Sequence, residues 1–186
     1  FTLCKVSLRR AYPLPLTLRR LDLRKTTPEP EFLGQIMRCT NLTSLTLIVD
    51  GEFPTNLLSG LVKLKEFQCW SLYHGQLQLP PSLTELRLFI TSDTDLSSLT
   101  NLQVLHMNNG ADYQVTFPRR IENLTVYERA PLGCNFPEVE VTFLHLVDVV
   151  GLTPEDFPNA RYVFFGPSET KHHFVTCEGH FLGSMF

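Results

Sequence analysis

The decapeptide LPPSLTELRL, residues 79–88, contains the pattern that decides the fold. Leu83, Leu86 and Leu88 have the spacing L-x-x-L-x-L, and Leu79 and Pro80 lie just before them. Leu86 and Leu88 are two residues apart, so in an extended chain both side chains point to the same side of a strand. An apolar residue before a proline can dock under the same core, because proline holds an extended entry. The stretch therefore predicts a short strand with one buried side.

The same pattern recurs along the chain, with other apolar residues in some of the three places. The copies are Leu18/Leu21/Leu23, Leu42/Leu45/Leu47, Leu64/Phe67/Cys69, Leu83/Leu86/Leu88, Leu102/Leu105/Met107, Ile121/Leu124/Val126, Val141/Leu144/Leu146 and Ala160/Val163/Phe165. From Leu18 onward, successive copies begin 24, 22, 19, 19, 19, 20 and 19 residues apart. A further trio, Leu3/Val6/Leu8, begins only 15 residues before Leu18, so this first copy is uncertain. One unit cannot cover its own apolar side, whereas stacked units cover each other, so the period predicts a repeat solenoid.

The segments between the copies leave little room for long helices. Five of them enter the next copy through an apolar residue and proline, at Leu14-Pro15, Leu79-Pro80, Phe117-Pro118, Phe136-Pro137 and Phe157-Pro158. Residues 31–39 have apolar side chains at helical spacing and are the best candidate for an α-helix, with a start at Thr27 or Pro28. Residues 57–61 and 96–99 predict short helical or 3₁₀ turns.

These units resemble the leucine-rich-repeat superfamily, and LPPSLTELRL is especially similar to the short, proline-entered repeats of bacterial effector proteins and of some protist proteins. The similarity covers about residues 12–166. It implies an α/β solenoid arc, with a parallel concave sheet of about eight short strands and mostly irregular or 3₁₀ segments on the convex side. The family usually places Asn two or three residues after the strand motif. Here those places hold Thr26, Asp50, Leu72, Thr91, Gly110, Arg129, Val149 and Ser168, so we expect no asparagine ladder and an irregular convex side.

The repeat divides the chain into an array over residues 1–166 and a tail over residues 167–186. The tail contains Phe174, Phe181, Leu182 and Phe186, and we expect it to cover the open end of the solenoid. At the other end the chain opens inside a repeat, so we expect further repeats or another domain before Phe1 in a longer protein.

Composition limits the class of protein and indicates its cellular compartment. The 186 residues have a formal net charge of -3, so no overall basic field attracts nucleic acid. No apolar stretch is long enough to span a membrane. The five cysteines (Cys4, Cys39, Cys69, Cys134 and Cys177) are odd in number and contain no C-x-x-C pair. We therefore expect reduced thiols in a cytoplasmic protein.

The residues between the inward ones should face out from the concave sheet. They include aromatic, histidine and arginine side chains, and Trp, Tyr and Arg are the side chains that most often anchor protein interfaces. We predict that the partner-binding surface contains Trp70, Arg87, Phe89, His106, Tyr127, Phe143, His145, Tyr162 and Phe164. Near the N-terminus Arg20 and Arg24 surround Asp22, so the face should run from basic to aromatic. In the alternative interpretation, a helix, a loop or the tail of this same chain covers the aromatic side chains.

The resemblance implies a protein–protein interaction module, acting as an adaptor, an effector or a recognition domain, with another protein as its partner. Two alternatives are the recognition domain of a larger enzyme, such as a ubiquitin ligase, and a nucleic-acid-binding surface at the basic pairs. We expect no catalytic residues and no cofactor, because phosphate-binding glycine loops are absent and nothing accompanies a nucleophile. We also expect no metal site, because the tail residues His172, His173, Cys177 and His180 match no zinc spacing and supply one thiolate.

Overall fold

The computed structural model describes most of the repeat array and two short strands of the tail. The described residues are 13–24, 28, 30–48, 56–69, 78–109, 113–127, 135–149, 154–166, 173–176 and 181–184. Residues before 13, Trp70 and most of the tail lie outside these ranges.

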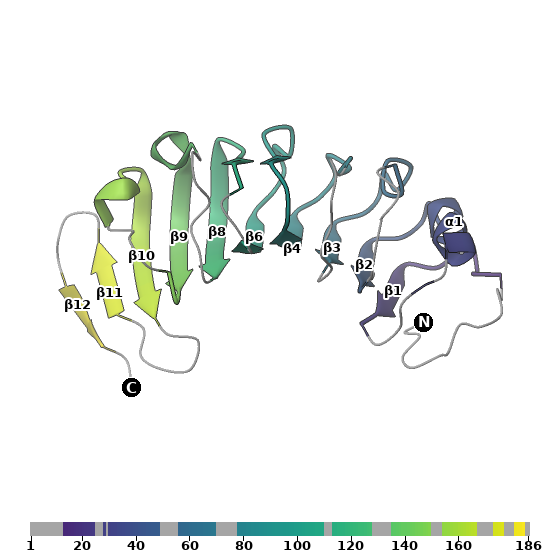
Figure 1. The fold of residues 1–186 in the computed structure, drawn as a ribbon, viewed down its shortest axis with the longest axis horizontal. Coiled ribbons are helices and arrows are strands. Elements are labelled where there is room, and N and C mark those ends of the chain that lie inside the picture. Colours follow the sequence, from purple (N-terminus) through teal and green to yellow (C-terminus); the bar gives the residue numbers. More distant parts are fainter. Residues whose placement is uncertain are drawn as a thin grey trace.

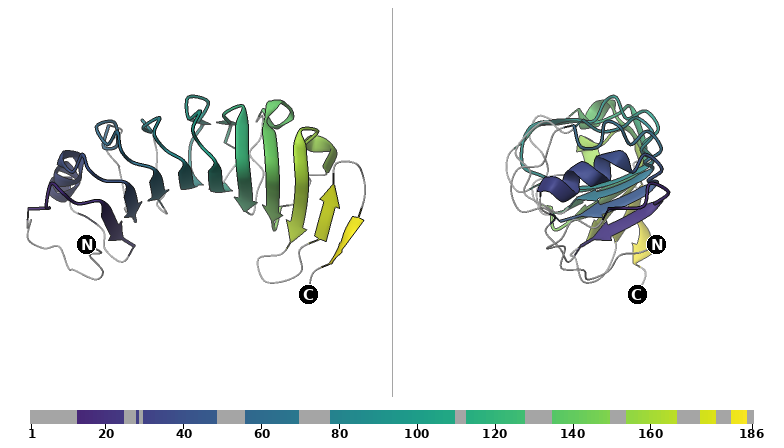
Figure 2. Two further views of the ribbon diagram at one scale, coloured as in Figure 1. Left: turned by 180° about the vertical axis from the view of Figure 1, so that it is seen from behind. Right: turned by 90° about the vertical axis from the view of Figure 1, so that its right-hand side faces the viewer.

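The architecture is a solenoid built on one large sheet, as the period predicts. Its ten strands follow the order β1-β2-β3-β4-β6-β8-β9-β10-β11-β12. The first eight run parallel: β1 (Arg20–Leu23), β2 (Ser44–Leu47), β3 (Glu66–Cys69), β4 (Glu85–Ile90), β6 (Val104–Asn109), β8 (Arg120–Tyr127), β9 (Glu140–Val147) and β10 (Ala160–Gly166). The strands line the inner side of an arc, and the connecting segments lie on its outer side (Figure 1). The views from behind and along the stack show the same arrangement (Figure 2).

The sequence pattern places the core between the sheet and the outer segments. In β4 the burial alternates residue by residue, with Leu86, Leu88 and Ile90 buried and the residues between them half-buried. The two-residue period of a strand puts the motif residues of the other units on the same side. In β2, β8 and β10, however, the outward residues Thr46, Thr125 and Phe164 are buried as well. The buried motif residues form a single core cluster that runs from Leu14 to Val163.

Neighbouring units are joined by a repeated backbone contact where each strand begins. The carbonyl of Thr43 accepts the N–H groups of Lys65 and Glu66, at 2.9 and 3.0 Å. The carbonyl of Lys65 in turn accepts those of Thr84 and Glu85, both at 2.9 Å. This contact satisfies the backbone at the strand entries and fixes each unit against the next.

Asparagine side chains also connect the units, although not at the family's usual place. They stand directly before the first motif residue, and their Nδ2 atoms donate to a carbonyl of the preceding unit. The bonds are Asn41 to Leu16 at 3.1 Å, Asn101 to Pro81 at 2.9 Å and Asn159 to Pro137 at 2.7 Å. The expected absence of asparagine after the strands therefore does not mean that the units lack side-chain bonds to one another.

The outer segments are short, as expected, with one addition. The predicted helix forms as α1 (Pro30–Arg38), and two 3₁₀ turns, η1 (Phe136–Glu138) and η2 (Pro154–Asp156), precede β9 and β10. The addition is a two-stranded parallel sheet between β5 (Thr94–Asp95) and β7 (Val115–Thr116). It joins two consecutive outer segments, and no sequence pattern indicated it.

Phenylalanine rings from the proline-entered segments stack inside the convex side. Phe136 lies between Phe117, with ring centroids 5.0 Å apart, and Phe157, with centroids 4.7 Å apart. All three rings are buried. The prediction that the apolar residue before proline docks under the core is confirmed here, and we call these three residues the phenylalanine stack. The predicted extended entry is wrong at Phe136-Pro137, because Phe136–Glu138 forms a 3₁₀ turn.

Beyond β10 the sheet continues with two antiparallel strands, β11 (His173–Thr176) and β12 (Phe181–Ser184). The tail thus extends the sheet at the C-terminal end (Figure 1). Its side chains lie outside the described part, so its expected role as a cover stays a prediction.

Of the five cysteines, the structure describes two, Cys39 and Cys69, and both are buried. Cys4, Cys134 and Cys177 fall outside the described ranges, so the expected redox state stays a prediction. Burial raises the pKa of Cys39, against the opposing effect of Arg38, and so disfavours the thiolate form of this side chain. In the described part of the chain, no helix combines the length and the apolar character that crossing a membrane requires.

Candidate partner-binding face

Strand register arranges the outward side chains of the concave face in three rows. The middle row contains Asp22, Thr46, Gln68, Arg87, His106, Thr125, His145 and Phe164, each beside the next on the neighbouring strand. One flanking row contains Arg20, Ser44, Glu66, Glu85, Val104, Asn123, Phe143 and Tyr162. In the other, Phe89, Asn108, Tyr127 and Val147 follow one another across β4, β6, β8 and β9. Eight of the nine predicted residues occupy these rows, and Trp70 lies outside the described residues.

Four of the predicted residues come together on β9 and β10. The ring of Phe143 stacks on Tyr162, with centroids 5.2 Å apart and an interplanar angle of 16°. His145 stacks on Phe164 at 4.5 Å, and Phe143 lies 6.3 Å from Phe164. We call Phe143, His145, Tyr162 and Phe164 the aromatic cluster. Offset-stacked rings of this kind stabilise each other and hold a rigid surface.

Burial distinguishes the members of the aromatic cluster. Phe164 is only 8% exposed, so it supports the other rings and presents little surface of its own. Phe143, His145 and Tyr162 are half-buried and keep part of each ring accessible. The guanidinium of Arg161 lies over the Tyr162 ring, 5.3 Å from its centroid, and adds a cation beside the cluster.

In the other flanking row, Phe89, Asn108 and Tyr127 follow one another in the register, as the spacing of the sequence predicts. Phe89 and Tyr127 are both half-buried. Sequence spacing places these rings in one row correctly and does not bring them into contact. They are separate outward-facing rings near the aromatic cluster and not part of it.

His106 lies in the middle row between Arg87 and the buried Thr125. The pKa of His106 is lowered, first by burial and then by the positive charge of Arg87 and by His145, while Glu85 acts in the opposite direction. Arg87 Nε donates to Glu85 Oε1 at 3.0 Å. The imidazole is therefore neutral at neutral pH and can accept or donate a hydrogen bond to a partner.

The N-terminal part of the face is charged but not basic. Each arginine is matched by a carboxylate: Arg24 with Asp22 at 2.6 Å, Arg87 with Glu85 at 3.0 Å, and Arg20 with Glu66 at 3.6 Å. The expectation of a basic end is therefore wrong for the described strands. Glu66 reaches Arg20 from two strands away, because the residue between them in the register is the short Ser44.

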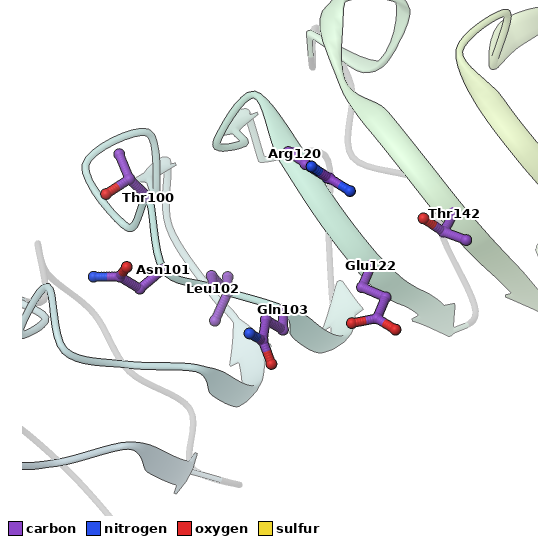
Figure 3. Close-up of a pocket in the computed structure, with 7 residues that line it drawn as sticks. All are labelled: Thr100, Asn101, Leu102, Gln103, Arg120, Glu122 and Thr142. Carbon is purple, nitrogen blue, oxygen red and sulfur yellow. The ribbon is translucent and has the colours of Figure 1, made fainter.

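A separate groove of about 460 Å³ lies beside the starts of β6, β8 and β9 (Figure 3). Its lining consists of Thr100, Asn101, Leu102, Gln103, Arg120, Glu122 and Thr142. None of these residues was predicted as a site, because they precede the outward places of the motif. The lining is mostly polar. Across the described ranges, no three His, Cys, Asp or Glu side chains gather as metal ligands would.

Comparison with known proteins adds no relative. No protein-family model, curated protein or solved structure matches the chain significantly. What the face can bind therefore follows from its own chemistry.

Proposed function

We propose that the chain is a leucine-rich-repeat protein that binds another protein on the concave face of its sheet. The regular motif, the buried motif positions and the arc of parallel strands support this assignment of the repeat. Repeats of this kind present a wide, continuous inner surface, because each unit adds one strand and one set of outward side chains.

The aromatic cluster is the observation on which the proposal depends. It places three half-buried rings, from Phe143, His145 and Tyr162, together on the inner face, with the buried Phe164 stacked on His145. Large rings in a rigid setting lose little conformational entropy on binding and exclude water over a wide area. A few such side chains supply most of the affinity in many protein interfaces.

A nucleic-acid partner is less well supported by the charges. The arginines of the described concave face are matched by Asp22, Glu66 and Glu85. Binding to nucleic acid depends mainly on cations that can contact phosphates, and these arginines already contact carboxylates.

Affinity capture with matched variants tests the proposal. The wild-type chain, a Phe143→Ala/Tyr162→Ala variant and a Val62→Ser control are used as baits in lysate of cells that produce the protein. Val62 is 64% exposed and lies in a turn before β3, so its replacement removes apolar surface outside the concave face. We expect wild type and control to retain the same protein, and the double variant to lose it.

The captured partner is then purified and titrated against the same three chains. We expect the double variant to bind at least about 2 kcal/mol more weakly, or roughly thirtyfold, while it remains folded at the temperature of the titration. Equal binding by all three folded chains would exclude the aromatic cluster as the partner site. A drop in melting temperature that matches the lost binding would instead show that the rings stabilise this chain alone.

A further inference from the structure

The concave face changes its chemistry between β4 and β6. On β1 to β4, six described outward positions are charged: Arg20, Asp22, Arg24, Glu66, Glu85 and Arg87. On β6, β8, β9 and β10, the twelve outward residues are Val104, His106, Asn108, Asn123, Thr125, Tyr127, Phe143, His145, Val147, Tyr162, Phe164 and Gly166. None of these twelve is Asp, Glu, Lys or Arg. We call this second surface the uncharged half.

We propose that the uncharged half binds an uncharged segment of a partner polypeptide, anchored by an aromatic or large aliphatic side chain on the aromatic cluster. This inference rests on the proposed function and specifies the partner's contact segment.

The absence of opposite charge is what selects an uncharged segment. A charged side chain laid on the uncharged half would lose water and find no counter-charge among its twelve outward residues, which costs free energy. On the neighbouring strand β4, Arg87 and Glu85 already pair with each other. Arg161 lies outside the outward rows and over Tyr162, so an acidic group could approach it only at the margin of the cluster.

The aromatic cluster provides the anchor. Phe143 and Tyr162 present nearly parallel rings, at an interplanar angle of 16°, and a further apolar side chain can pack on their accessible parts. Close by, Asn123 and Tyr127 on β8 and His106 on β6 offer neutral hydrogen-bonding groups. Neutral amide, hydroxyl and imidazole groups match the backbone N–H and C=O groups of a peptide.

The width of the surface sets the length of the segment. The four strands of the uncharged half span three strand spacings, which is about 14 Å in a sheet. An extended chain that crosses the strands covers this distance in about four residues. The contact segment is therefore a run of about four uncharged residues that includes one large apolar side chain.

Selection from a random peptide display library tests this inference. Peptides are selected on the wild-type chain, and those that bind equally well to the Phe143→Ala/Tyr162→Ala variant are removed. We expect the remaining peptides to share an uncharged run of about four residues with one aromatic or large aliphatic side chain. Replacing one residue of the run by Glu should weaken binding at least about tenfold, and the same change outside the run should have little effect.

A second pair of variants tests the charge argument without removing a ring. Asn123→Lys puts a cation on the uncharged half, and Asn123→Gln is its uncharged control. We expect the Lys variant to bind the selected peptides at least about tenfold more weakly, and the Gln variant to bind them with unchanged affinity. Cluster-dependent peptides with charges inside the run, or equal binding by both Asn123 variants, would overturn the inference and leave the proposed function standing. If selection yields no cluster-dependent peptide, the inference fails, and the affinity capture described above decides the proposed function separately.

Discussion

Removing the central ring of the phenylalanine stack tests how the repeats are held together. Phe136 is 6% exposed and contacts the Phe117 and Phe157 rings on either side, one from each neighbouring unit. Phe136→Ala removes the buried ring and leaves a cavity between two proline-entered segments. Such a change in a core costs about 3–5 kcal/mol, of which each ring–ring contact supplies about 0.5–1.5 kcal/mol.

This loss is large beside the total stability of a domain, which is about 5–15 kcal/mol. Urea titration followed by circular dichroism measures it, with Val62→Ala as the control. Val62 is 64% exposed, so its truncation should change the free energy of unfolding by less than about 0.5 kcal/mol. A Phe136→Leu variant keeps most of the apolar volume, so the difference between the Leu and Ala variants separates the cavity from the ring stacking.

A small loss of stability in Phe136→Ala would contradict this expectation. If Phe136→Ala lowers the free energy of unfolding by less than about 1 kcal/mol, the ring is not part of a packed core. A double-mutant cycle with Phe117→Ala measures the interaction energy between the Phe117 and Phe136 rings directly. Additive effects of the two changes would refute the argument that stacked rings connect neighbouring units, because residues in contact are expected to couple.

Two further predictions concern the concave sheet. Leu105 is fully buried in β6, so Leu105→Ala should lower the free energy of unfolding by about 2–5 kcal/mol. Amide hydrogen exchange should also rise in the neighbouring strands β4 and β8. A rise in exchange confined to β6 would contradict the coupling between neighbouring units. The pKa of His106 is lowered in the folded chain, chiefly by burial, so the fold favours the neutral imidazole. The contribution of the neutral His106 imidazole to the free energy of unfolding should be complete above about pH 6.5, which is the pKa of histidine in the unfolded chain. This contribution should be lost as the pH falls below that value. Urea titrations at several pH values should show this loss in wild type and a smaller one in His106→Gln; identical pH profiles would show that the imidazole is not desolvated.

The candidate site was predictable in its positions and not in its contacts. The nearly constant step between units fixes which residues are neighbours on adjacent strands, so Arg87, His106 and His145 could be assigned to one row in advance. The step does not fix side-chain rotamers or local curvature. The burial of Phe164 and the ring contacts of the aromatic cluster therefore emerged only from the folded chain.

The charge of the N-terminal strands shows the same limit. From the sequence, Arg20 and Arg24 around Asp22 predicted a basic end. The fold brings Glu66 from two strands away to Arg20, across the short Ser44, and balances the charge. Pairing of this kind depends on the distance between units that are 22 to 24 residues apart in the chain, and local sequence does not contain that distance.

The sequence by itself determined the period, the inward residues and the outward rows, because a strand's side chains alternate and each unit repeats the same pattern. Only the tertiary structure decided the phenylalanine stack, the small sheet between β5 and β7, the asparagine bonds between units and the aromatic cluster. Each of these features joins residues of different units across space. Such contacts form when stacking brings the units to a definite separation and rotation, and this geometry is a property of the whole solenoid rather than of any one repeat.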